Sequence, residues 1–232
     1  MEVSFDTTKK GLTINGGDGA DKIVGSRYSD TIKAGVGTGD YIEGGTGNDK
    51  LYASTTANSN TTFSFKAGDG NDFVYSGKGE DTLNFENISL SNITIERIKT
   101  NKGKNTNDLK ITYTDNDSVT IKDYYKVDKK KNSTNTIKHI TTKEGTFDLP
   151  SKIIYGEGDV IGSIDNEWIV VKDGNNTINS DKGDDIIIAG NGENTFKFAS
   201  GDGNDMIINA NSDDIIEFTG TVDKLEYEKD RQ

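Results

Sequence analysis

The sequence contains no cysteine, and its 232 residues include one histidine, one proline and one tryptophan. Zinc sites and nucleophiles of the Cys or Ser/His type therefore lack their parts, and we interpret His139 as a surface or packing residue. The lack of disulfides fits bacterial exoproteins and cytosolic proteins equally. No apolar run reaches about 18 residues and no secretory leader is seen, so we expect no transmembrane segment and an export address outside this segment.

Basic residues are in the minority. There are 27 Lys and Arg against 39 Asp and Glu, which gives a net charge of -12. This balance argues against a nucleic-acid partner or an anionic membrane surface and favours a metal ion or a polycation. Hydrophobic residues make up 31% of the chain, which is little material for a large core. We therefore expect part of the stability to come from a source other than apolar burial.

A nine-residue unit repeats along the chain. It reads Gly-Gly-Thr-Gly-Asn-Asp-Lys-Leu-Tyr at 44–52 and Gly-Gly-Asp-Gly-Ala-Asp-Lys-Ile-Val at 16–24. Glycine allows the positive φ of a tight turn whose carbonyl groups point inward, and the aspartate adds an ionised oxygen. Calcium takes six to eight such oxygens at about 2.3–2.6 Å. The unit therefore predicts a turn, a metal ligand and a short strand whose middle residue points into the core.

The unit resembles the nonapeptide of the RTX (repeat-in-toxin, haemolysin-type calcium-binding) family. The resemblance implies a parallel β-roll in which two nonapeptides make one coil, with several Ca²⁺ ions held between successive coils on each edge. It also implies export of an unfolded chain by a type I secretion machinery, guided by a C-terminal signal that we do not find here. The expected location is extracellular, for a bacterial protein.

The first array is predicted over 12–84, with a loop at 53–62. The apolar residues expected to point inward recur every nine positions, with one spacing of ten, at Ile14, Ile23, Ile32, Ile42 and Leu51. Since one coil takes two units, Asp21 and Asp40 should share one edge, and Asp30 and Asp49 the other. The unit at 25–30 has lost its internal glycines, so we expect a weaker site there.

Ordinary apolar alternation replaces the glycine pattern over 85–150. It predicts a small antiparallel β-module with a hairpin turn at 114–118 and a solvated basic loop at 126–135. The segment resembles the haemolysin-type calcium-binding related module that follows RTX repeats. The predicted fold is therefore all-β, with parallel β-roll (β-helix) arrays flanking this module.

A second, degenerate array is predicted over 151–217. Its residues expected to point inward are Val160, Ile169, Ile178, Ile187 and Phe196, followed after an insertion of two by Ile207 and Ile216. Residues 62–72 and 195–205 match closely, 133 positions apart, so 218–232 should begin a second, truncated module of a longer repetitive protein. The ligand position holds Glu167 in one unit and an amide at Asn176 and Asn194. An amide supplies an oxygen without charge, so we expect several of these turns to be held by packing and side-chain ladders without metal.

The predicted calcium ligands are turn glycines and the acidic residues within or closing the turns. They are Gly17, Asp18, Gly19, Asp21, Asp30, Gly35, Gly37, Asp40, Gly45, Gly47, Asp49, Gly68, Gly70, Asp72, Gly77, Gly79, Asp81, Gly183, Asp185, Gly201, Gly203 and Asp205. The bland alternative is a metal-free β-helix with solvated turns. EF-hand spacing is absent, and the neighbouring aspartates would repel a phosphate.

The predicted function is calcium binding coupled to folding in a secreted toxin- or adhesin-like protein, without catalysis. Two alternatives stay open. One is an adhesive stalk that binds a host or cell-surface ligand, with Trp168 at an outward position either contacting a partner or covering a roll end. The other is a β-helix enzyme that acts on acidic polysaccharide, because carboxylate pairs are abundant.

Overall fold

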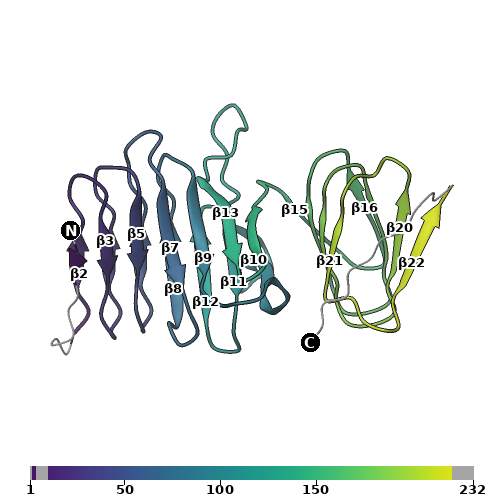
Figure 1. Ribbon diagram of the computed structural model, residues 1–232, viewed down its shortest axis with the longest axis horizontal. Coiled ribbons are helices and arrows are strands. Elements are labelled where there is room, and N and C mark those ends of the chain that lie inside the picture. The colour runs from purple at the N-terminus through teal and green to yellow at the C-terminus, as the bar shows by residue number, and fades with distance from the viewer. Residues whose placement is uncertain (1, 4–9, 221–232) are drawn as a thin grey trace. The chain divides into compact units, whose positions relative to one another are not determined.

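The computed structural model describes residues 2–3 and 10–220, and the chain divides into two compact units, Met1–Ser151 and Lys152–Gln232 (Figure 1). Each unit is described by itself. The described residues are almost all strands and turns, and their one helix is a 3₁₀ turn, η1 (Leu90–Asn92). Within the described part no helix is long and apolar enough to cross a membrane.

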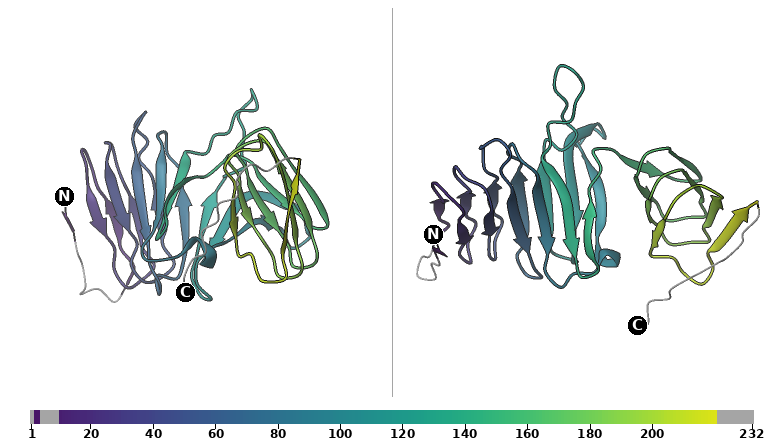
Figure 2. Two further views of the ribbon diagram at one scale, coloured as in Figure 1. Left: turned by 45° about the vertical axis from the view of Figure 1, so that its right-hand side comes forward. Right: turned by 45° about the horizontal axis from the view of Figure 1, so that its top comes forward.

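Unit 1 begins as a coil whose strands alternate between two parallel sheets, as the stacked arrows of Figures 1 and 2 show. The strands of the first sheet are β1 (Glu2–Val3), β3 (Lys22–Val24), β5 (Asp40–Glu43), β7 (Thr61–Phe65) and β9 (Asp81–Phe85). Those of the second are β2 (Thr13–Asn15), β4 (Thr31–Lys33), β6 (Lys50–Tyr52) and β8 (Asn71–Tyr75). Short strands alternate with tight turns because each unit offers only a few extended residues between its glycines. The predicted parallel β-roll is confirmed.

The core of this coil is a double column of apolar side chains between the sheets. In one column Ile14 pairs with Ile32, then Leu51 and Val74. In the other Ile23 pairs with Ile42, then Phe63 and Leu83. All eight are at most 8% exposed, which confirms the nine-residue period. Most of these strands bury one apolar residue, and β7 and β9 also bury Phe65 and Phe85, so the core is thin, at about 1.5–3 kcal/mol for each buried side chain.

Residues 85–150 extend both sheets. Their strands are β10 (Thr94–Lys99), β11 (Asn105–Thr112), β12 (Ser118–Lys122), β13 (Ile137–Thr142) and β14 (Gly145–Asp148). The antiparallel pairs β10–β11, β11–β12 and β13–β14 are present, and the predicted turn at 114–118 joins β11 to β12. However, β12 adds in parallel to β8, and β13 to β9. The predicted boundary at 84/85 lies within β9, and the predicted array and module form one compact unit.

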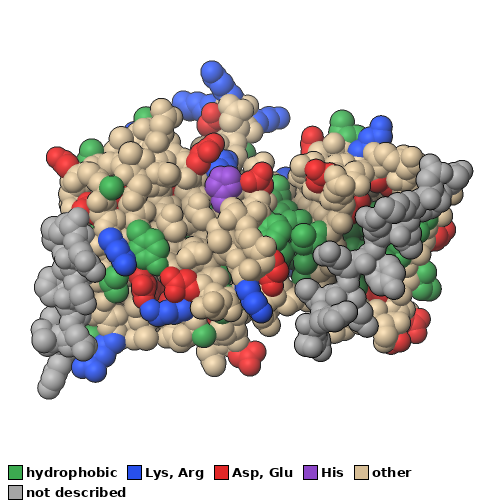
Figure 3. Space-filling view, in the orientation of Figure 1, with side chains coloured by type: hydrophobic (Ala, Val, Ile, Leu, Met, Phe, Trp, Pro, Cys, Tyr) green, Lys and Arg blue, Asp and Glu red, His purple; other side chains and the backbone are tan. Residues whose placement is uncertain are grey.

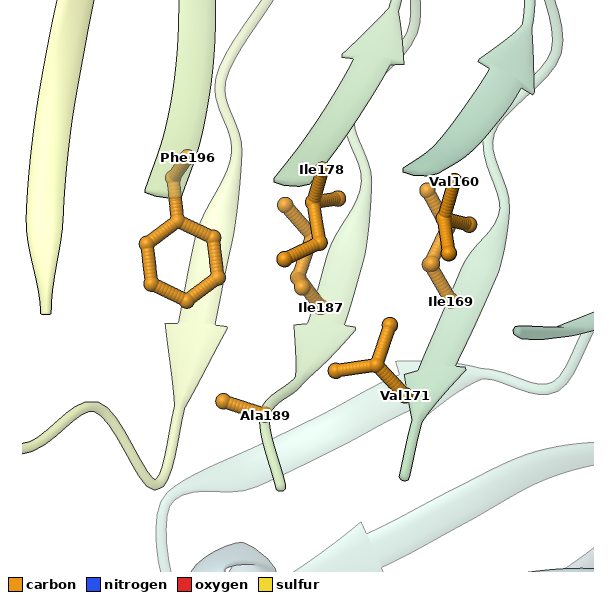
Figure 4. Packing of buried hydrophobic residues seen from close by; sticks show 7 residues of the cluster. All are labelled: Val160, Ile169, Val171, Ile178, Ile187, Ala189 and Phe196. Atoms are coloured by element: carbon orange, nitrogen blue, oxygen red, sulfur yellow. The ribbon is translucent and has the colours of Figure 1, made fainter. Parts of the chain in front are cut away.

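Unit 2 is a second parallel coil of two sheets. One sheet holds β15 (Ile153–Gly156), β17 (Trp168–Val171), β19 (Ile186–Ile188) and β21 (Met206–Ile208). The other holds β16 (Asp159–Ser163), β18 (Thr177–Asp181), β20 (Thr195–Ala199) and β22 (Ile215–Thr219). Figure 4 shows the core between them, where the inward side chains are Val160, Ile169, Val171, Ile178, Ile187, Ala189 and Phe196.

Two residues of unit 2 differ from expectation in their exposure. Ile216 pairs with Phe196 in the expected column, but it is 54% exposed, because β22 is the outermost strand of its sheet and no further described strand covers it. Trp168 lies outside the core cluster, as its predicted outward position requires, yet it is only 2% exposed, so it is not a surface aromatic. The second module predicted for 218–232 lies outside the described residues beyond Gly220.

The basic loop predicted at 126–135 is exposed along nearly its whole length and projects at the top of Figures 1 and 3, where basic side chains gather. His139, on β13, is half-buried, and its Nδ1 lies 2.9 Å from Oδ1 of Asp148. This contact agrees with its interpretation as a surface packing residue.

Close stacking of the coils predicts different effects for two glycines of one turn. Gly68 and Gly70 have φ of 95° and 100°. A methyl group at Gly70 would overlap the carbonyl oxygen of Gly47 in the neighbouring coil, whereas at Gly68 it would meet nothing within 4 Å. We expect Gly68→Ala to cost about 1–2 kcal/mol from backbone strain. Gly70→Ala should cost about 1–3 kcal/mol more, because the coils must separate. Urea unfolding of the two variants under one set of conditions measures the difference, and equal losses would contradict it.

Candidate metal centre

The aspartates that close the turns form ladders along the edges of unit 1. The backbone N–H of each donates to Oδ1 of its equivalent one coil further on. Asp21 donates to Asp40 (3.0 Å), Asp30 to Asp49 (2.7 Å), and Asp49 in turn to Asp72 (2.8 Å). The pairing of Asp21 with Asp40 and of Asp30 with Asp49 along separate edges is confirmed.

Unit 2 repeats this ladder on the edge that precedes β17, β19 and β21. Glu167 donates its N–H to Oδ1 of Asp185 (2.7 Å), and Asp185 donates to Oδ1 of Asp205 (3.0 Å). Gly183 and Gly203, two residues before these aspartates, have φ of 130° and 121°, and Gly201 has 95°. The predicted residues of this turn pair are therefore brought together.

The second oxygen of these carboxylates, Oδ2, indicates whether a turn can bind a cation. Asp40, Asp49 and Asp185 are at most 2% exposed, and Oδ2 of each is buried without a hydrogen-bond donor. A buried acceptor without a partner costs about 1–3 kcal/mol, and more when it is charged. Native structures rarely keep such groups, so these oxygens call for a positive partner that the polypeptide does not supply.

The backbone around these oxygens offers further ligands. Gly45 and Gly47 have φ of 87° and 135°, and a methyl group at Gly44 would overlap Oδ2 of Asp49. The carboxylate of Asp49 therefore lies against the backbone of its own turn, at a distance that leaves no room for a side chain at position 44. Carbonyl and carboxylate oxygens are hard donors of the kind that Ca²⁺ prefers. The residues of this turn therefore fit calcium.

Side chains alone do not make a metal site. Among residues 2–3 and 10–220 there is no group of three or more His, Cys, Asp or Glu side chains placed to hold an ion. Any ion must therefore take most of its ligands from backbone carbonyl groups, and this is the role that the glycine turns suit.

Burial and mutual repulsion raise the pKa of the ladder carboxyls. Removal from water is the main cause, and it raises the pKa of Asp49 to about 7, of Asp72 to about 8 and of Asp185 to about 7. Neighbouring carboxylates add to this, as Asp49 does for Asp72. The pKa values of Asp40 and Asp205 are raised for the same leading reason. A cation would reverse both effects.

Asp30 does not need a cation. The N–H of Ser26 donates to its Oδ2 (2.6 Å), and the hydroxyl of Ser26 donates to its Oδ1 (3.1 Å). Glu167 has the same arrangement, since the N–H and the hydroxyl of Ser163 donate to its two oxygens. In both turns serine replaces the second glycine of the repeat. Its N–H donates to the carboxylate oxygen that would otherwise face a cation.

The predicted site at Gly77, Gly79 and Asp81 also has its donors within the chain. Oδ1 of Asp81 accepts the N–H of Thr61 (2.9 Å), and Oδ2 accepts the hydroxyl of Thr136 (2.6 Å). Neither glycine has positive φ. Both oxygens of Asp81 are therefore satisfied within the chain without an ion.

The turn at Gly35 and Gly37 is partly occupied by a hydroxyl. Ser54 donates to the carbonyl oxygens of both glycines (3.3 and 3.0 Å). Oδ1 of Asp40 accepts the N–H of Asp21, which closes the previous turn on this edge, and in that turn Gly17 and Gly19 have φ of 96° and 103°. Asp18, in that same turn, is exposed.

Sequence reasoning missed two buried acidic residues at the turn of Gly68 and Gly70. Both glycines donate their N–H groups to the carboxylate of Asp117 (2.9 Å each), so Asp117 ends this edge. Asp69 is 1% exposed and has one oxygen, Oδ1, without a donor. The acidic composition of the hairpin at 114–118 could have pointed to Asp117. The contact between Asp117 and Gly68, however, joins residues 49 positions apart, which a nine-residue repeat does not predict.

The raised pKa values predict how the metal-free chain responds to pH. A carboxyl whose folded pKa is raised binds more protons when folded, so its stabilisation is full below about pH 4 and is lost as pH rises through about 7 to 8. In calcium-stripped buffer, the far-UV circular dichroism (CD) should therefore show more strand at pH 5 than at pH 8. Asp72→Asn, which removes one titrating group, should flatten the profile. A strand signal that grows with pH would contradict this.

Comparison with known proteins identifies the repeats. The family described as RTX calcium-binding nonapeptide repeat (4 copies) matches residues 15–51, 64–86 and 161–196. Among solved structures, the extracellular lipase LipA from Serratia marcescens is similar at 19% identity and a TM-score of 0.26, over 87% of this chain and 33% of the lipase. No curated protein matches the sequence.

Proposed function

We propose that this chain, which carries RTX calcium-binding nonapeptide repeats, binds several Ca²⁺ ions in the turns of its β-roll and folds as it binds them outside the cell. In this proposal it is a non-catalytic part of a larger bacterial exoprotein of toxin or adhesin kind, exported by a type I secretion machinery. The repeats matched by the family model and the parallel β-roll support this reading.

One observation carries the proposal: buried carboxylate oxygens of Asp40, Asp49 and Asp185 lack any donor from the protein. The oxygens that would hold calcium come from these carboxylates and from the carbonyl groups of their turns. When bound, the ion supplies positive charge that the ladders lack. Each site that exists only in the folded state stabilises it by RT ln(1 + [Ca²⁺]/Kd). Extracellular calcium modules bind at about 10⁻⁴–10⁻³ M, so cytosolic calcium would leave the chain loose.

A calcium titration of the full chain tests this. We expect mostly coil in chelator, and strand signal in far-UV CD once millimolar calcium is added. Magnesium at the same concentration is the control, because its small octahedral shell suits a carbonyl cradle poorly. No spectral change with calcium, together with no heat of binding in calorimetry, would overturn the proposal.

A second candidate function, a ligand-binding stalk, rests on one surface feature of unit 1. A polar pocket of about 380 Å³ is lined by Tyr75, Asp108, Lys122 and their neighbours. Tyr75 stacks on Tyr52 with ring centroids 4.3 Å apart. A glycan array probed with the calcium-loaded chain tests this, with Tyr75→Ala as the matched variant. Absence of any glycan signal that this variant abolishes would remove the candidate.

A further inference from the structure

One edge of unit 2 satisfies its turns without carboxylates. We name the turns that close at Asn176, before β18, and at Asn194, before β20, the amide edge. Both asparagines are buried, at 3% and 0% exposure. They occupy the place in the nonapeptide that aspartate holds in the turns with donor-free oxygens.

The side chain of Asn176 presents its nitrogen, not its oxygen, to the turn. Nδ2 donates to the carbonyl oxygens of Lys172 and Gly174 (2.9 Å each) and to Oδ1 of Asn194 (2.8 Å). Its own Oδ1 accepts the N–H of Gly158 (2.8 Å). Carbonyl oxygens only accept, so the atom that faces them must be the amide nitrogen.

Asn194 continues the same pattern one coil further on. Its Nδ2 donates to the carbonyl oxygen of Gly190 (3.0 Å) and to Oδ1 of Asp214 (3.1 Å). The carbonyl oxygen of Gly192 accepts the side-chain amide of Asn211 (2.9 Å). The carbonyl oxygens of Lys172, Gly174, Gly190 and Gly192 are thus all met by amide hydrogens.

The backbone of the amide edge matches that of the acidic turns at the glycine two residues before the closing side chain. The glycine two residues before the closing side chain has φ of 121° at Gly174 and 122° at Gly192, against 135° at Gly47 and 130° at Gly183. Its N–H donates to the next coil in each type, as from Gly174 to Asn191 (2.7 Å) and from Gly47 to Asp69 (2.8 Å). The two kinds of turn differ in the closing side chain and also four residues before it, where Gly45 and Asp181 have φ of 87° and 63° in the acidic turns, whereas Lys172 and Gly190 have no positive φ in the amide edge.

We infer that the amide edge takes no calcium, because the asparagine amide hydrogens already bind the carbonyl oxygens that an ion would need. Unit 2 then binds calcium on one edge only, at Asp185 and Asp205. The side-chain ladder agrees with the expectation that several turns of this array are held without metal, and the direction of the amide nitrogen supplies the physical reason. This inference rests on the proposed calcium binding of the acidic turns and adds which turns are excluded and why.

The inference predicts that a single atom exchange in each turn creates a calcium site. In the full chain, Asn176→Asp together with Asn194→Asp puts a buried oxygen opposite the same carbonyl groups. We expect this double variant to bind at least one Ca²⁺ more than the wild type in equilibrium dialysis. We also expect it to need about tenfold more calcium for the emission change of Trp168, the sole tryptophan, which lies in unit 2.

The possible results distinguish a failure of the amide-edge inference from a failure of the proposed calcium binding. A wild type that binds no calcium would remove the proposed function, whereas a double variant that binds no more than a calcium-binding wild type overturns the inference. Should the double variant stay unfolded at all calcium concentrations, the wild type decides by NMR hydrogen exchange. Side-chain amide protons of Asn176 and Asn194 that exchange slowly in calcium support the inference, and fast exchange overturns it.

Discussion

Alanine at position 49 is expected to move the calcium midpoint of folding to at least about tenfold higher concentration, a loss of about 1.4 kcal/mol or more. The substitution removes the donor-free oxygen and also the acceptor of the Asp30 N–H, 2.7 Å away. Far-UV CD during a calcium titration measures the midpoint. Asp115→Ala, which removes one exposed carboxylate from the hairpin at 114–118, is the control for net charge and should leave the midpoint in place.

Asparagine at position 49 should behave differently from alanine. It keeps an oxygen for the Asp30 N–H and brings an amide nitrogen to the turn, as Asn176 does in unit 2. We expect Asp49→Asn to bind less calcium than the wild type but to hold more strand in chelator. Equal midpoints for the wild type and both Asp49 variants would show that this carboxylate is not a ligand.

Alanine in place of Phe63 is expected to unfold unit 1 while unit 2 stays folded. Phe63 is fully buried in the thin core of unit 1, and Phe→Ala in a core costs about 3–5 kcal/mol. Near-UV CD of Tyr113 and Tyr124, both buried in unit 1, should collapse in saturating calcium. The emission of Trp168 should not change.

The mirror experiment uses Phe196, which is equally buried in the core of unit 2. Phe196→Ala should change the emission of Trp168 and leave the tyrosine signal of unit 1 in place. If either variant removes both signals together, the two units unfold as one cooperative structure. The prediction that they unfold independently would then be wrong.

The repeating part of this fold could be predicted because the residues that determine each turn and strand lie within a single nine-residue unit. Glycines that need positive φ, and one apolar residue in the middle of each strand, act within nine residues. The core columns through Ile23 and Ile32, and the shared edge of Asp21 and Asp40, follow from that spacing alone. The number of strands in each sheet of unit 1 could not be predicted in this way. The strands β12 and β13 join the two sheets through pairs that are 47 and 56 residues apart in sequence, Ser118 with Asn71 and Ile137 with Asp81.

Which turns need an ion was harder to predict, because it depends on contacts that the nonapeptide does not contain. Asp81 looks like a ligand in sequence, but Thr136, 55 residues away, supplies the donor for its second oxygen. For Asn176 the sequence predicted a turn without metal, but which of its two amide atoms points into the turn is decided by the groups that face it. The glycine pattern predicts the turn, and the surroundings decide how its oxygens are satisfied.

The antiparallel strands that end unit 1 have a consequence for solubility. A stack of parallel coils would leave open backbone groups on which another chain could add, as in cross-β fibrils. Here the outer strand β10 carries Glu96, Arg97 and Lys99, and its register with β11 shifts between Arg97 and Lys99. Charges and an irregular register make a poor template. The β10 edge of this sheet therefore resists the addition of another chain and growth into a fibre.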